Sequence, residues 1–271
     1  MPIAIPSAFQ CFQAIQRLAI ILAMFKPFWI ALQFLTCLPI TLQKQPTDQQ
    51  IGYSLTYYPL VGLLLGLILI SLCSFFSLFA TAWINAAIVL TAWILLTGGL
   101  HLDGLADSAD AWVGGMGDRA RTLAIMKDPN CGPMGVIAIV LIILLKFVAL
   151  YTLIQALQSI ALLASIVLAR TSLVLLFLTT PYVRNVGLGS CLAANHSSRW
   201  CILIISAVCF LITFFFENGF FYIVSTVMVF LLLRQAMMNR IGGTTGDTAG
   251  GLVEVVETIV LLTATVVMHQ P

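Results

Sequence analysis

Charged residues are scarce in this chain of 271 residues: only 8% are Asp, Glu, Lys or Arg, and the formal net charge is +2. A balance so close to neutral excludes the basic surface that a nucleic-acid partner requires. The seven cysteines include no Cys-x-x-Cys pair, so the sequence indicates neither a structural zinc site nor a redox motif.

Apolar residues dominate instead. They make up 61% of the chain, and the mean hydropathy is +1.08, whereas an ordinary soluble domain is roughly 45–50% apolar. Several runs approach the ~20 residues that cross a bilayer, where the backbone must be helical. The sequence therefore predicts an all-α, polytopic membrane bundle of about seven transmembrane helices, or six if one run does not cross. The predicted spans are 57–79, 81–99, 134–154, 158–180, 200–216, 219–237 and 252–268.

The first 27 residues precede every predicted span. Their apolar patch between Arg17 and Lys26 is only eight residues long, and no small-residue cleavage site follows it. We expect residues 1–27 to form an extension that contains an interfacial helix, and residues 28–271 to form one membrane-embedded catalytic domain. The small-xxx-small spacing at 62–66 allows two helices to pack closely, either within one chain or in a homo-oligomer.

Basic residues predict the orientation. Ten of the twelve flank the predicted spans on one side, while the connections around residues 80, 155 and 218 and the C-terminal tail have none. The positive-inside rule then places the N-terminus and the candidate site loops in the cytoplasm and the C-terminus outside. The ten are Arg17, Lys26, Lys44, Arg119, Arg121, Lys127, Arg184, Arg199, Arg234 and Arg240.

The remaining two basic residues, Lys146 and Arg170, lie inside predicted spans. A charge at mid-bilayer costs roughly 2.5–3.5 kcal/mol, so such residues usually face the bundle interior with a partner; the alternative is snorkelling to the interface. Glu254 and Glu257 share one face of the last helix, and they either pair with these cations or take part in catalysis.

Three carboxylates converge in "GGLHLDGLADSADAW" (98–112). Asp103, Asp107 and Asp110 stand at i, i+4 and i+7, which places them on one helix face within about 60°. Like charges this close repel unless a cation compensates them, and Mg²⁺ is usually held by one or two carboxylates with substrate phosphates. The pattern predicts a metal–phosphate site, with a solvated helix face at the membrane border as the alternative.

Two further segments have features of a phosphate-binding site. In "AIMKDPNCGPMG" (124–135), Lys127 and Asp128 precede a Pro- and Gly-broken helix start, where free amides suit an anion. In "GGTTGDTAGGLVEVVE" (242–257), a glycine-rich loop lets backbone amides approach phosphate, but it lacks the lysine and spacing of a P-loop. Together with the carboxylates, these segments predict phosphoryl or nucleotidyl chemistry on a metal-neutralised diphosphate.

These segments, with "FWIALQFLTCLPI" (28–40) and "YYPLVGLLLG" (57–66), occur in an order and spacing that resemble the cobalamin synthase family, the adenosylcobinamide-GDP ribazoletransferases, over about residues 28–268. The resemblance implies an Mg²⁺-dependent enzyme of the bacterial inner membrane. Such an enzyme joins adenosylcobinamide-GDP to α-ribazole, or to its phosphate, and releases GMP.

The resemblance also implies roles for individual residues. Asp103, Asp107 and Asp110 would bind the metal, and the catalytic set would also contain His101, Asp128 and Asp247. Lys127, Thr245 and Gly246 would contact the substrate phosphates. Either Asp110 or Asp128 is expected to accept the proton of the attacking ribose hydroxyl.

Two other functions are compatible with clustered aspartates in a membrane protein. A CDP-alcohol phosphotransferase would show the signature D-G-x-x-A-R, from which "DGLADS" (103–108) departs. An ion-coupled transporter would use Lys146, Arg170, Glu254 and Glu257 as a charge relay, but transporters tend to show inverted repeats. The sequence shows no such repeat.

Overall fold

The protein is all-α, as predicted. A computed structural model describes residues 26–268, apart from 41, 43, 44 and 186. Residues 1–25, which contain most of the predicted N-terminal extension and its interfacial helix, lie outside the described residues. In the part of the chain that is described, helices are joined by loops, and the extended backbone is limited to one isolated bridge, between Tyr182 and Thr244.

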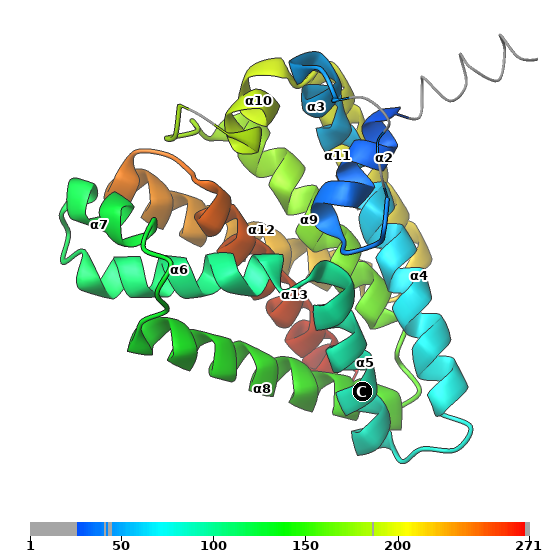
Figure 1. Ribbon diagram of the computed structural model, residues 1–271. Coiled ribbons are helices and arrows are strands. Elements are labelled where there is room, and N and C mark those ends of the chain that lie inside the picture. The colour runs from blue at the N-terminus through cyan, green and yellow to red at the C-terminus, as the bar shows by residue number, and fades with distance from the viewer. Residues whose placement is uncertain (1–25, 41, 43–44, 186, 269–271) are drawn as a thin grey trace, which may run out of the picture.

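The helices follow one another along the whole described chain (Figure 1). They are α2 (Lys26–Leu35), α3 (Asp48–Ser54), the 3-10 turn η1 (Leu55–Tyr57), α4 (Tyr58–Phe76), α5 (Ala82–Thr97), α6 (Leu100–Gly114), α7 (Arg119–Ile125), α8 (Pro133–Gln155), α9 (Ala161–Thr179), α10 (Leu188–Asn195), α11 (Ser198–Phe215), α12 (Gly219–Ile241) and α13 (Gly246–Val267). Six stretches are long and apolar enough to cross a membrane: Asp48–Phe76, α8, α9, α11, α12 and α13. The pair α5 and α6 qualifies as a seventh only when the two helices are taken together.

A sharp bend separates α5 from α6. The two helices meet at 85°, and the residues between them, Gly98 and Gly99, have φ angles of 64° and 68°, a left-handed conformation that glycine adopts without strain. With 16 residues, α5 is about 24 Å long. The following helix, α6, lies across the bundle (Figure 1) and contains all three clustered aspartates. We therefore treat α5 as the span and α6 as a helix at the membrane border.

The central helix of the bundle is α9. In its apolar stretch 83% of the residues are buried, compared with 17% in α11, whose side chains face outward. Against α9 packs α4, through two glycines. A Cβ atom on Gly62 would lie 3.1 Å from the Ile166 carbonyl oxygen, and one on Gly66 would lie 2.4 Å from the Leu163 side chain. The small-xxx-small spacing thus serves helix packing within one chain.

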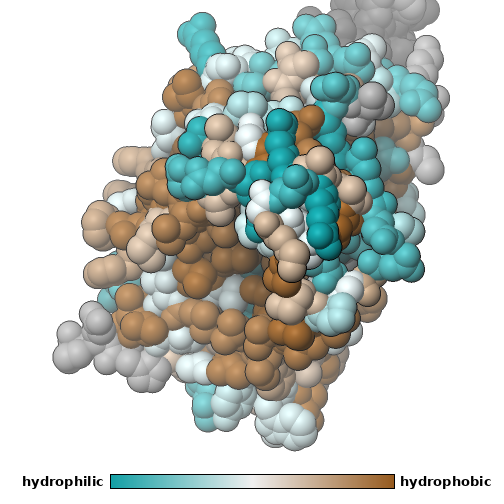
Figure 2. Space-filling view, turned by 90° about the vertical axis from the view of Figure 1, so that its left-hand side faces the viewer, coloured by the Kyte–Doolittle hydropathy of each residue, from teal (hydrophilic) through white to brown (hydrophobic). Residues whose placement is uncertain are grey.

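The surface has the pattern of a multi-pass membrane protein. Hydrophilic residues gather at one end, and a broad hydrophobic band lies below them (Figure 2). Helices α2, α3 and α10 lie at one end of the bundle, while the α4–α5 connection, the α8–α9 connection and the end of α13 lie at the other (Figure 1). Successive connections therefore lie at opposite ends of the bundle, as expected for helices that cross a membrane one after another.

The last helix begins earlier than expected. The predicted span started at residue 252, but α13 starts at Gly246, because Thr245 and Thr248 form a reciprocal cap: Thr248 N donates to Thr245 Oγ1 at 3.2 Å, and Thr245 N donates to Thr248 Oγ1 at 2.9 Å. The glycine-rich loop is therefore confined to 242–245. Gly246 and Asp247 belong to the first turn of a helix, which corrects their placement in a loop.

Candidate active site at the crossing of α6 and α13

The site lies where α6 crosses the start of α13, and glycines allow the two backbones to meet. A Cβ atom on Gly104 would lie 2.7 Å from the Asp247 carbonyl oxygen and 3.0 Å from its Cα. One on Gly250 would lie 3.3 Å from the His101 Cα and carbonyl oxygen. Because neither glycine has a side chain, the aspartate face of α6 and Asp247 of α13 come together.

Asp107 stands at the centre of this charge cluster. Burial and the negative charges of Asp103, Asp247 and Asp110 together raise the pKa of its carboxyl to about 6, and only the guanidinium of Arg184 opposes them. The helical register predicted for the three aspartates of α6 is confirmed. The cluster contains more negative than positive charge, which is the electrostatic condition for binding a cation.

Asp110 differs from its two neighbours because both of its oxygens have partners. Gly132 N donates to Oδ2 at 2.6 Å, and Gly135 N donates to Oδ1 at 2.9 Å. These amides belong to the start of α8, where Pro133 follows the N-cap residue Gly132. The free amides that the sequence had offered to a substrate phosphate are therefore occupied by a carboxylate of the chain itself.

Arg184 belongs to the site, although its place in the sequence indicated only the orientation of the chain in the membrane. Thr244 N donates to the Pro181 carbonyl at 2.8 Å, and Val183 N donates to the Thr244 carbonyl at 2.9 Å. This short pairing places Arg184 Nη2 2.5 Å from Asp247 Oδ2. No local motif marks Arg184, since its partner is 63 residues further along the chain.

A cavity of about 290 Å³ opens between these groups. Its charged lining comes from Asp103, Arg184 and Asp247, next to His101 and Gly246. His101 is 4% exposed, and its Nε2 has no hydrogen-bond partner among the described residues. Burial, assisted by the positive charges of Arg170 and Lys146, lowers the pKa of His101 well below its usual value, so the ring is neutral.

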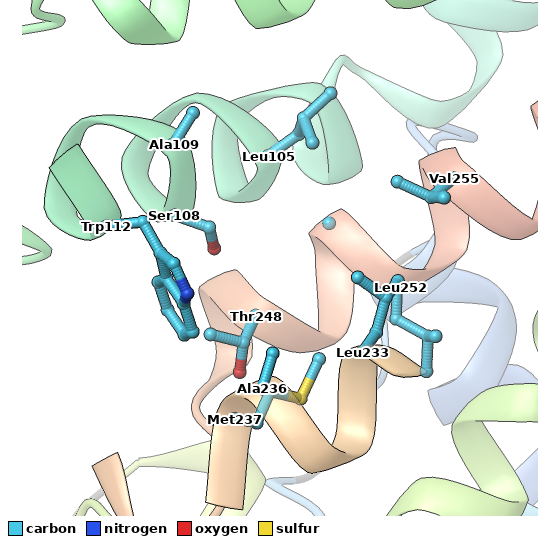
Figure 3. Close-up of a pocket in the computed structure, with 11 residues that line it drawn as sticks. Leu105, Ser108, Ala109, Trp112, Leu233, Ala236, Met237, Thr248, Leu252 and Val255 are labelled. Carbon is cyan, nitrogen blue, oxygen red and sulfur yellow. The ribbon is translucent and has the colours of Figure 1, made fainter. Parts of the chain in front are cut away.

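A second cavity, of about 200 Å³, lies on the opposite face of α6, between that helix, α12 and α13 (Figure 3). Leu105, Trp112, Leu233 and Leu252 line it, together with the hydroxyl-bearing Ser108 and Thr248. No ionisable side chain lines this cavity. The chemistry expected of the aspartates therefore belongs to the first cavity.

The loop with Lys127 and Asp128 lies beside the site at the surface. Its neighbour Met126 is buried, and the Met126 carbonyl accepts a hydrogen bond from Arg184 Nη2 at 3.4 Å. Asp128 accepts from Asn130 N at 3.0 Å and Asn130 Nδ2 at 2.7 Å, which lowers the pKa of the Asp128 carboxyl. Lys127 is exposed, and its ammonium has no ion pair among the described residues.

The four intramembrane charges lie together. Lys146 Nζ is 2.6 Å from Glu254 Oε2 and also bonds Glu257, which in turn bonds Arg170. All four residues are at least 95% buried, and the Lys146 ammonium lies 4.5 Å from the centre of the Trp93 ring. Two cations and two anions form a neutral cluster, so of the two roles that the sequence left open for the glutamates, the structure shows the pairing.

Within the residues that the structure describes, no three His, Cys, Asp or Glu side chains are placed to hold a metal ion by themselves. A cation at Asp103 and Asp107 would therefore need further ligands from water or from a substrate. Mg²⁺ is commonly bound in this way, by one or two carboxylates and substrate phosphates.

Comparison with known proteins supports one family. The model of the family described as cobalamin-5-phosphate synthase matches residues 27–265. The chain is 53% identical over 241 residues to the adenosylcobinamide-GDP ribazoletransferase of Pseudomonas fluorescens (strain Pf0-1), covering 87% of this chain and 97% of the relative. It is 51% identical over 239 residues to that of Acinetobacter baumannii (strain ACICU), covering 88% and 96%. No solved structure matches the chain. The chain belongs to the cobalamin-5-phosphate synthase family.

Proposed function

We propose that the crossing of α6 and α13 is the catalytic centre of an adenosylcobinamide-GDP ribazoletransferase. The enzyme joins adenosylcobinamide-GDP to α-ribazole, or to α-ribazole phosphate, and releases GMP. The observation that supports this most directly is the group of Asp103, Asp247 and Arg184 at the cavity of about 290 Å³, with Asp107 close enough to sense all three charges. This charge arrangement occurs in a chain whose relatives bear the name of that activity.

The carboxylates fit Mg²⁺. Asp103, Asp107 and Asp247 place three negative charges opposite one guanidinium, so a divalent cation would relieve their repulsion. We assign the ion to Asp103 and Asp107, with Asp247 beside them, whereas Asp110 holds the start of α8. When bound, Mg²⁺ neutralises charge on the diphosphate of the substrate and polarises the reacting phosphorus.

The chain supplies further contacts for the diphosphate. Arg184 lines the cavity and offers the donors of its guanidinium that Asp247 does not use. Lys127, exposed and without an ion pair in the described part of the chain, adds a second point charge from the neighbouring loop. The N-terminus of α13 at Gly246, which lines the cavity, directs the positive end of its helix dipole to the same place. Thr245 is fully buried and caps α13, so it supports this helix start and does not contact the substrate phosphates.

The transfer forms one phosphoester bond and breaks one bond of the diphosphate. A free ribose hydroxyl of α-ribazole attacks the phosphorus attached to cobinamide, and GMP leaves with the bridging oxygen. The hydroxyl proton passes to a carboxylate of the cluster. Of the two residues that the sequence favoured as the base, Asp110 already accepts a backbone N–H with each oxygen. The donors of Asn130 lower the pKa of Asp128, which makes Asp128 a weaker base.

The location follows from the basic residues. Eight of the ten that define the orientation are described, and three of them, Arg119, Arg121 and Lys127, lie in or next to α7 beside the site. The positive-inside rule places this end in the cytoplasm, in the inner membrane of a bacterium. The family assignment decides against a CDP-alcohol phosphotransferase and an ion-coupled transporter.

The test uses membranes that contain the protein, with Mg²⁺, adenosylcobinamide-GDP and α-ribazole, and mass spectrometry of cobalamin and GMP. Asp103→Asn and Asp107→Asn should each lower turnover on the order of 100-fold, since each removes charge at the reacting phosphate. The matched control is Asp118→Asn, because Asp118 is exposed and caps α7, a role that asparagine also fills. Full turnover by both site variants at ordinary Mg²⁺ would refute the metal site.

A further inference from the structure

We propose that the apolar part of the cavity at α6 and α13 binds the aromatic base of the acceptor nucleoside and selects a benzimidazole riboside. This inference rests on the proposed function and adds the place where one substrate is recognised. The charged lining comes from α6, from α13 and from the segment 181–184. The opposite lining is apolar and comes from α2, α4, α9 and α10. Its members are Phe34, Tyr58, Leu173, Phe177, Leu188 and Leu192.

Two stacked aromatic pairs line the cavity. Phe34 and Tyr58 have ring centres 6.4 Å apart and planes 26° apart. Phe177 and Tyr182 have ring centres 5.9 Å apart and planes 23° apart. Tyr58 is 1% exposed and Phe177 is 7% exposed, so the core holds both rings in place before any ligand arrives. Nucleic-acid bases stack on such preformed rings, because every base has a π-face.

The chemistry of the lining favours the base of α-ribazole over the guanine of the other substrate. Dimethylbenzimidazole is flat, has two methyl groups and has one free ring nitrogen. Guanine has several donors and acceptors along its edges, and burial without partners would be costly for them. Leu173, Leu188 and Leu192 offer no such partners. The apolar lining therefore matches a methylated benzimidazole.

The size and position of the cavity agree with this assignment. At about 290 Å³ it lies just below the usual range for ligand sites, roughly 300–1,000 Å³. It suits one nucleoside and is too small for a corrinoid. With the base among the aromatic rings, the ribose extends toward Asp103 and Arg184. The hydroxyl that attacks phosphorus would thus meet the diphosphate at the charged side of the same cavity.

The decisive variant fills the cavity from its rim. Leu188 lines the cavity and is 48% exposed, so Leu188→Trp adds volume without rearranging the core. Leu211, also 48% exposed, lines a separate apolar cavity on α11 and gives the matched control Leu211→Trp. We expect Leu188→Trp to raise the KM for α-ribazole at least about tenfold. The KM for adenosylcobinamide-GDP should stay within about twofold of wild type, and Leu211→Trp should change neither value.

A base series provides a second measurement. In the wild type, the riboside of unsubstituted benzimidazole should have a kcat/KM about fourfold lower for each missing methyl group. Phe177→Leu, which keeps an apolar side chain, should reduce this discrimination. A rise in the KM for adenosylcobinamide-GDP alone would mean that the cavity holds guanine, and unchanged constants for Leu188→Trp would mean that the cavity is not used. Either result overturns the proposal.

The proposed function fails separately, if the wild type forms no cobalamin from the two substrates. In that case, direct binding of α-ribazole to the wild type and to Leu188→Trp still tests the cavity. Equal affinity of the two proteins would overturn the inference, and weaker binding to the variant would support it.

Discussion

The close approach of α6 and α13 makes Gly104 the most sensitive position near the site. A Cβ atom at this position would lie 2.7 Å from the Asp247 carbonyl oxygen, about 0.7 Å short of ordinary contact. The opposing atoms are backbone, so no side chain can rotate away. Gly104→Ala must therefore separate the two helices by several tenths of an ångström and displace Asp247 from Asp103 and Asp107.

The size of the effect follows from this displacement. Overpacking of a close contact costs roughly 1–3 kcal/mol of stability, which the helix propensity of alanine offsets by about 1 kcal/mol. Catalysis should suffer more, because a misplacement of about 1 Å can cost on the order of 100-fold in rate. We expect Gly104→Ala to lower kcat by about 10- to 100-fold while the melting temperature falls by only a few degrees.

A neighbouring glycine provides the control. Gly251 faces the same helix pair, but a Cβ atom there would lie 3.6 Å from the Leu105 Cα and 3.7 Å from Ser108 Oγ, which is ordinary contact. Gly251→Ala should therefore keep wild-type turnover and be at least as stable. The assay measures initial rates of cobalamin formation and thermal unfolding in detergent. If Gly104→Ala is as active as wild type, or if Gly251→Ala loses as much, the argument from helix separation is wrong.

Three further predictions concern the charges. Lys127→Ala should raise the KM for adenosylcobinamide-GDP about tenfold without lowering thermal stability, because an exposed ammonium contributes one point charge to the diphosphate; an unchanged KM would exclude this contact. Lys146→Met should destabilise the protein by roughly 3–5 kcal/mol by leaving a buried carboxylate unpaired. Glu254→Gln should rescue its stability in part and Glu257→Gln should not, because Glu257 keeps a second cationic partner. In a background without native cysteines, Lys127→Cys should react with impermeant thiol reagents only from the cytoplasm and Gln158→Cys only from outside. Labelling of both from the same side would contradict the orientation.

The helical periodicity of the aspartates is a local property, and the sequence was sufficient to predict it. Residues at i, i+4 and i+7 share a face in any α-helix, so Asp103, Asp107 and Asp110 had to line up once the segment became helical. Apolar length similarly predicts the spans, because the thickness of the bilayer sets it. The order of the motifs was sufficient to indicate the family.

The sequence did not predict that the three aspartates have different roles. Asp110 does not line the cavity. Its carboxylate instead accepts hydrogen bonds from the N–H groups of Gly132 and Gly135, which are more than 20 residues away in the sequence. A sequence in which three carboxylates share one face contains no sign that one of them caps another helix. Only the docking of α8 against α6 makes that distinction.

Long-range contacts also determine the other parts of the site. Arg184 meets Asp247 across 63 residues, through the pairing of 181–184 with 242–245, and the apolar side of the cavity combines four helices from distant parts of the chain. Helical period and hydrophobic length depend on neighbours within a few residues, so the sequence determined the spans and the carboxylate face by itself. Which helices touch depends on the packing of the whole bundle. Only the tertiary structure therefore shows that Arg184 pairs with Asp247, that Asp110 caps α8, and that aromatic rings from distant helices line one cavity.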